Sequence, residues 1–165
     1  MRHKIYLRRD EKGLGCYSAR RLIRIAVNAA LKSEGIDMPC ELSVLLTDDE
    51  GIKKLNREFR QTDSATDVLS FPANEFEADS LEFAGAETNE KTGRVFLGDI
   101  ALSLERAAAQ GLEFGHGTKR EIQYLTVHSV LHLLGYDHID EGAMKRQMRD
   151  GEKKIMAAIK GNNKK

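Results

Sequence analysis

The sequence predicts a single α+β domain in which a small mixed sheet of about four strands packs against helices. Three observations support this fold class: a length of 165 residues, an alternation of strand and helix patterns, and the absence of linker-like composition between them. The hydrophobic fraction of 41% and the charged fraction of 32% exclude a disordered, collagen-like or disulfide-scaffold class. We therefore expect one domain over residues 1–165 with one core.

The first two predicted elements are a strand and a helix. Residues 3–8 have the pattern of a short strand, and residues 18–34 have that of a helix with Ser18 as its cap and Gly35 as its stop. The apolar side chains of this helix form one stripe, which we expect to face the core: Leu22, Ile25, Ala26, Ala29 and Ala30.

The middle of the chain repeats this alternation. Residues 41–47 have a strand pattern, and residues 48–60 form a predicted helix whose three leading acids suit its N-terminus. Residues 66–71 are the next predicted strand, and Pro72 confines that end to a sheet edge or a strand terminus. Residues 74–90 carry six acidic and no basic side chains and lack periodicity, so we expect an exposed loop or hairpin connection.

The last third of the chain is mostly helical. Residues 94–102 form the fourth predicted strand, followed by a helix near residues 103–112. Two further helices are predicted from about residue 118 to 134 and from about residue 140 to 160. We expect these helices to lie against the sheet.

The charges are segregated although the net charge is zero, with 26 basic and 26 acidic residues. Residues 1–24 and residues 145–165 each carry eight basic and two acidic side chains. These segments predict a basic face, and the alternative is solvated helix faces and a polar tail.

The sequence also bears on location and redox state. No run of 18 or more apolar residues is present, and residues 1–10 are too charged for a secretory signal, so we expect a soluble cytoplasmic protein without a membrane partner. Cys16 and Cys40 lack metal-site spacing, so we expect reduced thiols without a chemical role.

The strongest chemical signal is the segment HSVLHLLGYDH, residues 128–138. On a helix, His128 and His132 lie on the same face and can both reach one ion. Gly135 ends the helix, because glycine tolerates a left-handed conformation, and the reversal can bring His138 toward the other two imidazoles. Three nitrogen ligands leave a fourth tetrahedral position for water, which is typical of a catalytic zinc site, so we expect one Zn²⁺ ion.

Two satisfied core histidines are the alternative for the pair, but the third histidine and the glycine favour a metal. Imidazole also suits nickel, copper and iron, and zinc is the ion we expect. Asp137 is a candidate acceptor for a ligand imidazole, with a surface carboxylate as the alternative. We expect the isolated His3 and His116 not to be ligands.

The spacing also matches the zinc-protease signature H-E-x-x-H-x-x-G-x-x-H. Where that signature has its glutamate base, this chain has Ser129, whose hydroxyl cannot take a proton from zinc-bound water as a carboxylate does. A zinc metallopeptidase is therefore a less favoured alternative.

Four blocks in the same order resemble the bacterial YbeY family of endoribonucleases, also described as rRNA maturation factors. The blocks are LNREFR at residues 55–60, TDVLSFP at 66–72, LGDIALS at 97–103 and HSVLHLLGYDH at 128–138. The resemblance covers roughly residues 45–140. It implies one α+β domain that binds one zinc ion through three histidines and cleaves single-stranded RNA in small-subunit rRNA maturation and ribosome quality control.

The resemblance also places the conserved arginine of the family on Arg60 as a catalytic residue. A guanidinium beside a metal cleft can hold a phosphodiester through two hydrogen bonds and offset the charge that grows on its oxygens. The alternative is a surface arginine that pairs with Glu58 or Asp63.

The chain departs from the family pattern at two places. The family usually has Lys-Asp-x-Pro-Thr after the arginine, whereas residues 62–66 here are Thr-Asp-Ser-Ala-Thr, so we expect weaker ligand affinity or a less ordered loop. Ser129 replaces a glycine, which should leave the ligands in place.

Three routes to cleavage remain open: zinc polarises a phosphoryl oxygen, zinc activates a water, or the 2′-hydroxyl of the RNA attacks. Binding would depend on phosphate neutralisation by the basic segments, because only 6% of residues are aromatic and tryptophan is absent. A different class of function is also open: a ribosome-assembly binding factor in which zinc mainly holds the C-terminal helices in place.

Overall fold

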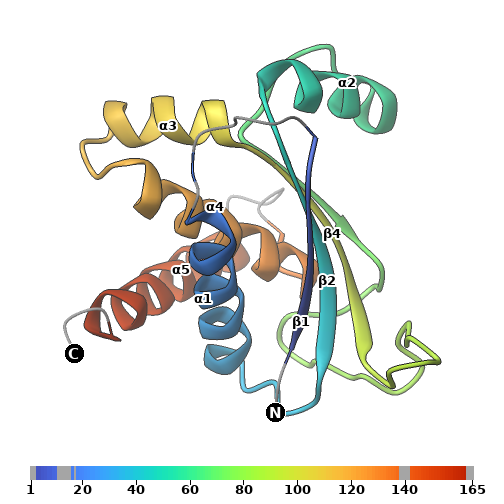
Figure 1. The fold of residues 1–165 in the computed structure, drawn as a ribbon. Helices are drawn as coiled ribbons and strands as arrows, with labels where there is room; N and C mark the ends of the chain where they lie inside the picture. Colours follow the sequence, from blue (N-terminus) through green and yellow to red (C-terminus); the bar gives the residue numbers. More distant parts are fainter. Residues whose placement is uncertain (1–2, 11–15, 17, 138–141, 163–165) are drawn as a thin grey trace.

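The computed structural model describes residues 3–10, 16, 18–137 and 142–162 and confirms the predicted α+β fold (Figure 1). These residues form a four-stranded sheet and five helices. In chain order the elements are β1 (Lys4–Arg9), α1 (Ala19–Ser33), β2 (Cys40–Thr47), α2 (Asp49–Arg60), β3 (Val68–Pro72), β4 (Val95–Ser103), α3 (Leu104–Glu113), α4 (Thr118–Leu133) and α5 (Ala143–Asn162).

The sheet has the strand order β1-β2-β4-β3 and is mixed. β1 pairs with β2 and β2 with β4 in parallel, whereas β3 runs antiparallel to β4. β2 is one of the two central strands and is largely buried, although Glu41, Ser43 and Thr47 interrupt its apolar sequence. β3 is an edge strand that ends at Pro72, so the proline lies where the sequence predicted it.

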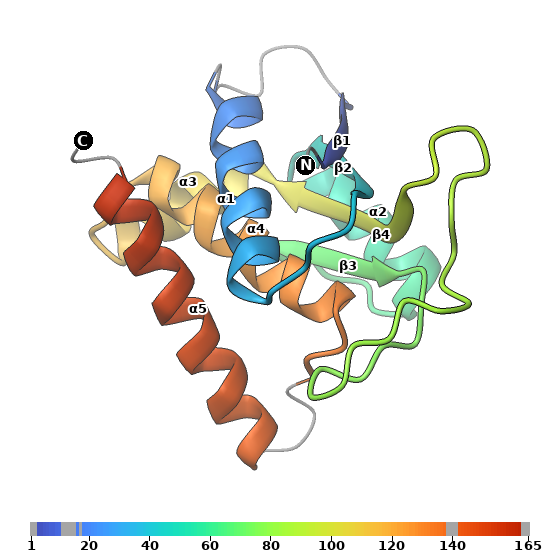
Figure 2. The same ribbon diagram turned by 90° about the horizontal axis from the view of Figure 1, so that it is seen from below.

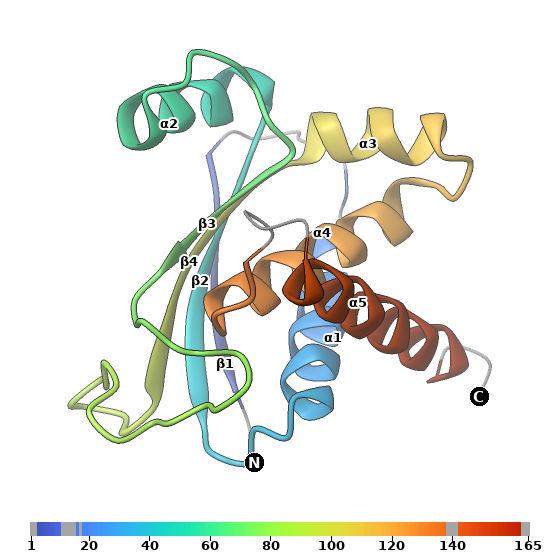
Figure 3. The same cartoon turned by 180° about the vertical axis from the view of Figure 1, so that it is seen from behind.

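The helices α1, α4 and α5 form two layers on one face of the sheet, as Figures 2 and 3 show. α1 and α4 lie next to the strands and contact each other extensively, and α5 packs against both of them from outside. α2 lies over the opposite face, where a small second core cluster contains Ile52, Leu69 and Ala101. The edge strand β3 is therefore covered by α4 on one side and contacted by α2 on the other.

The buried face of α1 is wider than the predicted stripe. Leu22, Ala26 and Ala30 are buried as expected, and Ile23 and Val27 are fully buried as well, because α1 contacts both α4 and α5. The predicted core positions 25 and 29 are only half-buried. Ser18 does occupy the N-cap position, but its side chain makes no capping hydrogen bond, so that part of the prediction was wrong.

The acidic connection between β3 and β4 is an irregular loop, as predicted, apart from one isolated bridge between Thr88 and Val95 (Figure 2). Cys16 is a half-buried free thiol and Cys40 is a buried one. Across the ranges given above, no helix is long and apolar enough to cross a membrane.

Candidate functional site

Two of the three predicted metal ligands lie side by side on α4. The Nε2 atoms of His128 and His132 are 3.0 Å apart, and the ring centroids are 4.5 Å apart. α4 ends just before Gly135, whose φ of +102° is a conformation that side chains rarely adopt. A Cβ atom there would lie 2.2 Å from the carbonyl oxygen of Phe76, so only glycine fits. His138, the third predicted ligand, lies outside the described residues.

The partners of the other ring nitrogens define the state of both imidazoles. The Nδ1 atom of His132 is 2.8 Å from the carbonyl oxygen of Tyr136, which can only accept, so Nδ1 carries the proton. The Nδ1 atom of His128 is 2.6 Å from Oε1 of Glu152 and donates to this carboxylate. In the neutral rings, both facing Nε2 atoms therefore carry lone pairs. A proton or a metal ion between the two Nε2 atoms, which are 3.0 Å apart, satisfies both lone pairs, so this donor set fits a metal ion.

Glu152 is the acceptor that the sequence prediction missed. This α5 residue is only 7% exposed, and its second oxygen accepts a hydrogen bond of 2.9 Å from the hydroxyl of Tyr124. Burial, followed by the charge of Glu152, raises the pKa of Tyr124, so its hydroxyl stays a donor. The missed signal was positional: Glu152 falls on the stripe of α5 that also carries the buried Met148, Ile155 and Ile159, where a carboxylate needs a partner.

A cleft of about 570 Å³ lies beside the two imidazoles. Its lining comes from Arg60, residues 66–70 and Pro72 together with His128, His132 and residues 135–137. The structure therefore brings three of the four predicted site residues to one cleft between β3 and α4. A second hollow of about 640 Å³ lies on the opposite face of the sheet and contains none of them.

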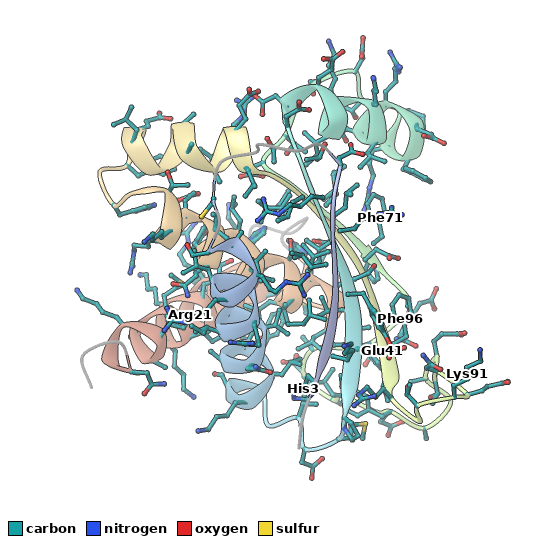
Figure 4. The ribbon with its side chains drawn as sticks, in the orientation of Figure 1. His3, Arg21, Glu41, Phe71, Lys91 and Phe96 are labelled. Carbon is teal, nitrogen blue, oxygen red and sulfur yellow. The ribbon has the colours of Figure 1, made fainter. Side chains whose placement is uncertain are left out.

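Arg60 is the last residue of α2 and is exposed. Its Nη2 atom donates a hydrogen bond of 2.6 Å to the carbonyl oxygen of Ser70, and its guanidinium lies 5.3 Å from the centre of the Phe71 ring. Figure 4 shows Phe71 on the side of the sheet toward α2. Asp63 forms its ion pair with Arg57, at 3.9 Å, and among the described residues the predicted alternative of a pair between Arg60 and Glu58 or Asp63 is not formed. Arg60 thus keeps further N–H donors for a ligand in the cleft.

Hydrogen bonds hold both segments in which the chain departs from the family pattern, namely the loop after α2 and the position of Ser129. The loop after α2 is held by Asn56, whose carbonyl oxygen accepts from the backbone of Thr62 and whose side chain donates to the carbonyl oxygen of Ser64. Ser129 is fully buried, and its hydroxyl lies 3.0 Å from that of Ser70, so this contact ties α4 to β3. Ser129 does not line the cleft.

The remaining candidates divide between the cleft and the rest of the molecule. Asp137 is exposed and lines the cleft, and Asp67 is a further lining carboxylate that the sequence analysis missed. The oxygens of Asp67 accept from the backbone of Val68 and from the amide of Gln110, which holds this group in place. His3 accepts a hydrogen bond from the backbone of Cys40, and neither it nor His116 lines the cleft.

Comparisons with known proteins find one matching family model, similar sequences and a similar solved structure. The family model described as "Endoribonuclease YbeY" matches residues 6–160. Proteins named "Endoribonuclease YbeY" from Clostridium botulinum (strain Loch Maree / Type A3) and Clostridium kluyveri (strain NBRC 12016) are 45% and 43% identical to it. The alignments cover 83% and 85% of this chain and 86% and 88% of those proteins. The solution structure of a Thermotoga maritima protein matches with a TM-score of 0.61 and 25% identity over 97% of this chain and 91% of that one.

Proposed function

The chain belongs to the endoribonuclease YbeY family, and from that premise we propose that it is a zinc-dependent endoribonuclease that cleaves single-stranded RNA during small-subunit rRNA maturation. The observation that carries the proposal is the shared cleft of Arg60, His128 and His132, in which two imidazoles present lone pairs to one point. The proposed site of action is the small ribosomal subunit in the cytoplasm, in rRNA processing and ribosome quality control.

His128 and His132 would hold the metal, with His138 as the third ligand expected from the sequence. When bound, zinc supplies Lewis acidity toward a phosphodiester. Glu152 and the carbonyl group of Tyr136 keep both Nδ1 atoms protonated and both Nε2 atoms available. These second contacts fix the ring orientations before any ligand enters.

Arg60 would bind the phosphodiester. Its guanidinium can donate two parallel hydrogen bonds to phosphoryl oxygens and offset charge that grows on them during cleavage. The Ser70 carbonyl group and the Phe71 ring limit the positions that this long side chain samples. The Ser70–Ser129 contact joins β3, to which the Arg60 side chain is hydrogen-bonded, to α4, which carries the two imidazoles. This contact maintains the distance between the guanidinium and the imidazoles.

One observation favours the alternative of a binding factor with a mainly structural zinc. The contact between His128 and Glu152 joins α4 to α5, so a metal on His128 would also stabilise the position of α5. Circular dichroism separates the two functions, because removal of a structural zinc unfolds the protein, whereas removal of a catalytic zinc leaves the fold largely intact.

The proposal is tested by cleavage of an end-labelled single-stranded rRNA fragment with the wild type, His132→Ala and His3→Ala, purified identically. His3 lies outside the cleft, so its variant is the matched control for the loss of a histidine. We expect cleavage by the wild type and by His3→Ala and none by His132→Ala. Equal cleavage by all three would identify a contaminating nuclease, and no cleavage by any would refute the proposal. A cyclic phosphate on the product would indicate attack by the 2′-hydroxyl, and its absence would indicate attack by water.

A further inference from the structure

A second, basic groove lies between α4 and α5. It has a volume of about 430 Å³, and its lining includes four cationic side chains: Arg120, Arg149, Lys153 and Lys160. All four are exposed, and none forms an ion pair with another described residue. The groove therefore holds four cationic side chains against one carboxylate, that of Glu152. Three of the four cations, Arg149, Lys153 and Lys160, belong to the basic segment at residues 145–165 that the sequence analysis described.

The cations of the groove include a like-charged pair on one helix. Arg149 and Lys153 are four residues apart on α5, so they are neighbours on one helix face and repel each other. The carboxylate in the lining, that of Glu152, directs its oxygens to the hydroxyl of Tyr124 and to Nδ1 of His128. Like charges that are gathered on one face without compensation indicate a binding surface for an anion.

The groove and the cleft lie along one ridge of α4. Arg120, Tyr124, His128 and His132 follow one another at intervals of four residues, which places them in a row on the helix surface. Arg120 is thus about 12 Å along the helix axis from His128. Tyr124 joins the two ends, since it lines the groove and its ring stacks beside that of His128 with the centroids 6.2 Å apart.

We propose that the α4–α5 groove binds the phosphodiester backbone of single-stranded RNA and leads the strand to the cleft. The proposal rests on the proposed function for the identity of the polymer. A flexible strand with one phosphate per nucleotide can follow a row of cations into a concave groove, whereas a flat lipid surface can contact only its rim. The groove is separate from the residues that would hold the metal and Arg60, so it contributes to binding and not to the chemical step.

The test compares two double variants that each remove two positive charges. Arg149→Gln/Lys153→Gln removes them from the groove, and Lys53→Gln/Lys54→Gln removes them from exposed positions on α2, which lies far from α5 (Figure 3). Both pairs are made in the full chain carrying His132→Ala, so that the RNA stays intact. Binding of a fluorescein-labelled single-stranded RNA is measured by fluorescence anisotropy over a range of salt concentrations, with circular dichroism as the check on folding.

We expect the groove variant to weaken binding roughly 10- to 30-fold at about 0.1 M salt and to reduce the slope of log affinity against log salt by about 1.4, because two phosphate contacts are lost. The α2 variant should change affinity less than about threefold. The single variant Lys160→Gln should give a smaller loss in the same direction, which covers the case in which the double variant does not fold.

Equal losses in the two double variants, or no loss in the groove variant, would overturn the proposal. Binding of the wild type to vesicles with anionic headgroups, without binding to RNA, would overturn it in favour of a lipid ligand. The outcome is independent of cleavage: an intact groove effect together with an inactive wild type would support the groove and refute the proposed nuclease.

Discussion

Replacing Glu152 with alanine should weaken metal binding without changing any metal ligand. The variant removes the acceptor 2.6 Å from Nδ1 of His128 and the acceptor 2.9 Å from the hydroxyl of Tyr124. Without the carboxylate, His128 loses the hydrogen bond at Nδ1 that fixes its orientation and tautomer. The ring can then rotate or protonate on the nitrogen that should bind the metal.

The expected magnitude follows from these two contacts. Loss of a carboxylate that orients a ligand imidazole costs about 10- to 100-fold in metal affinity, which corresponds to about 1.4–2.7 kcal/mol. In the metal-free protein, two donors next to a nearly buried site lose their partner, which costs about 1–3 kcal/mol in the free energy of unfolding. Glu152→Gln keeps an acceptor oxygen for Nδ1, so its loss of affinity should be less than about tenfold.

Zinc affinity is measured by titration into the chelator-treated full chain, in competition with a chromogenic chelator. Asp150→Ala is the matched control, because it removes one negative charge from an exposed position of the same helix. We expect zinc affinity in the order wild type and Asp150→Ala, then Glu152→Gln, then Glu152→Ala. Equal affinities for Glu152→Ala and Asp150→Ala would refute the role of Glu152.

Three further predictions concern catalysis, the turn after α4 and a buried thiol. Arg60→Ala should reduce RNA cleavage by about 10²- to 10³-fold in a gel assay with an unchanged circular dichroism spectrum, because the side chain is exposed; full activity would exclude Arg60 from catalysis. Gly135→Ala should lower the free energy of unfolding by about 3 kcal/mol or more, because it combines a positive φ with a clash against Phe76; a Tm within about 2 °C of the wild type would contradict this. Burial raises the pKa of the Cys40 thiol to about 11, so the unfolded state ionises first above pH 9 and stability falls as the pH rises toward 11. Urea unfolding should show a shallower decline for Cys40→Ala, and an unchanged slope would argue against that burial effect.

Periodicity predicted most of the fold because strands and helices here are strongly patterned. The predicted helix at residues 48–60 corresponds to α2, which is amphipathic and buries Ile52 and the polar Asn56. Asp48 caps this helix, because its side chain accepts a hydrogen bond from the backbone of Gly51. The buried face of α1 was predicted less well. A helix enclosed by two other helices buries residues such as Ile23 that a single stripe does not include.

The site was predictable where it is local in sequence and not where it depends on packing. His128 and His132 are four residues apart, so helix geometry alone places them together. Arg60 is 68 residues before His128, and only the resemblance to the family connected them before the structure placed both at one cleft. The acceptors for the imidazoles are a carboxylate on α5 and a backbone carbonyl group. Every residue has a backbone carbonyl group, so the residue types in a sequence cannot predict which one accepts.

The central claim is that metal at the α4 histidines is required for RNA cleavage on a scaffold that folds without it. Its most direct test is cleavage of one labelled single-stranded rRNA fragment by the full chain before chelation, after chelation and after zinc is restored, with circular dichroism recorded at each step. We expect activity to disappear on chelation and return with zinc while the helical signal stays largely constant. Cleavage that persists in the chelated protein would contradict the claim, and loss of the helical signal on chelation would show that the metal is structural.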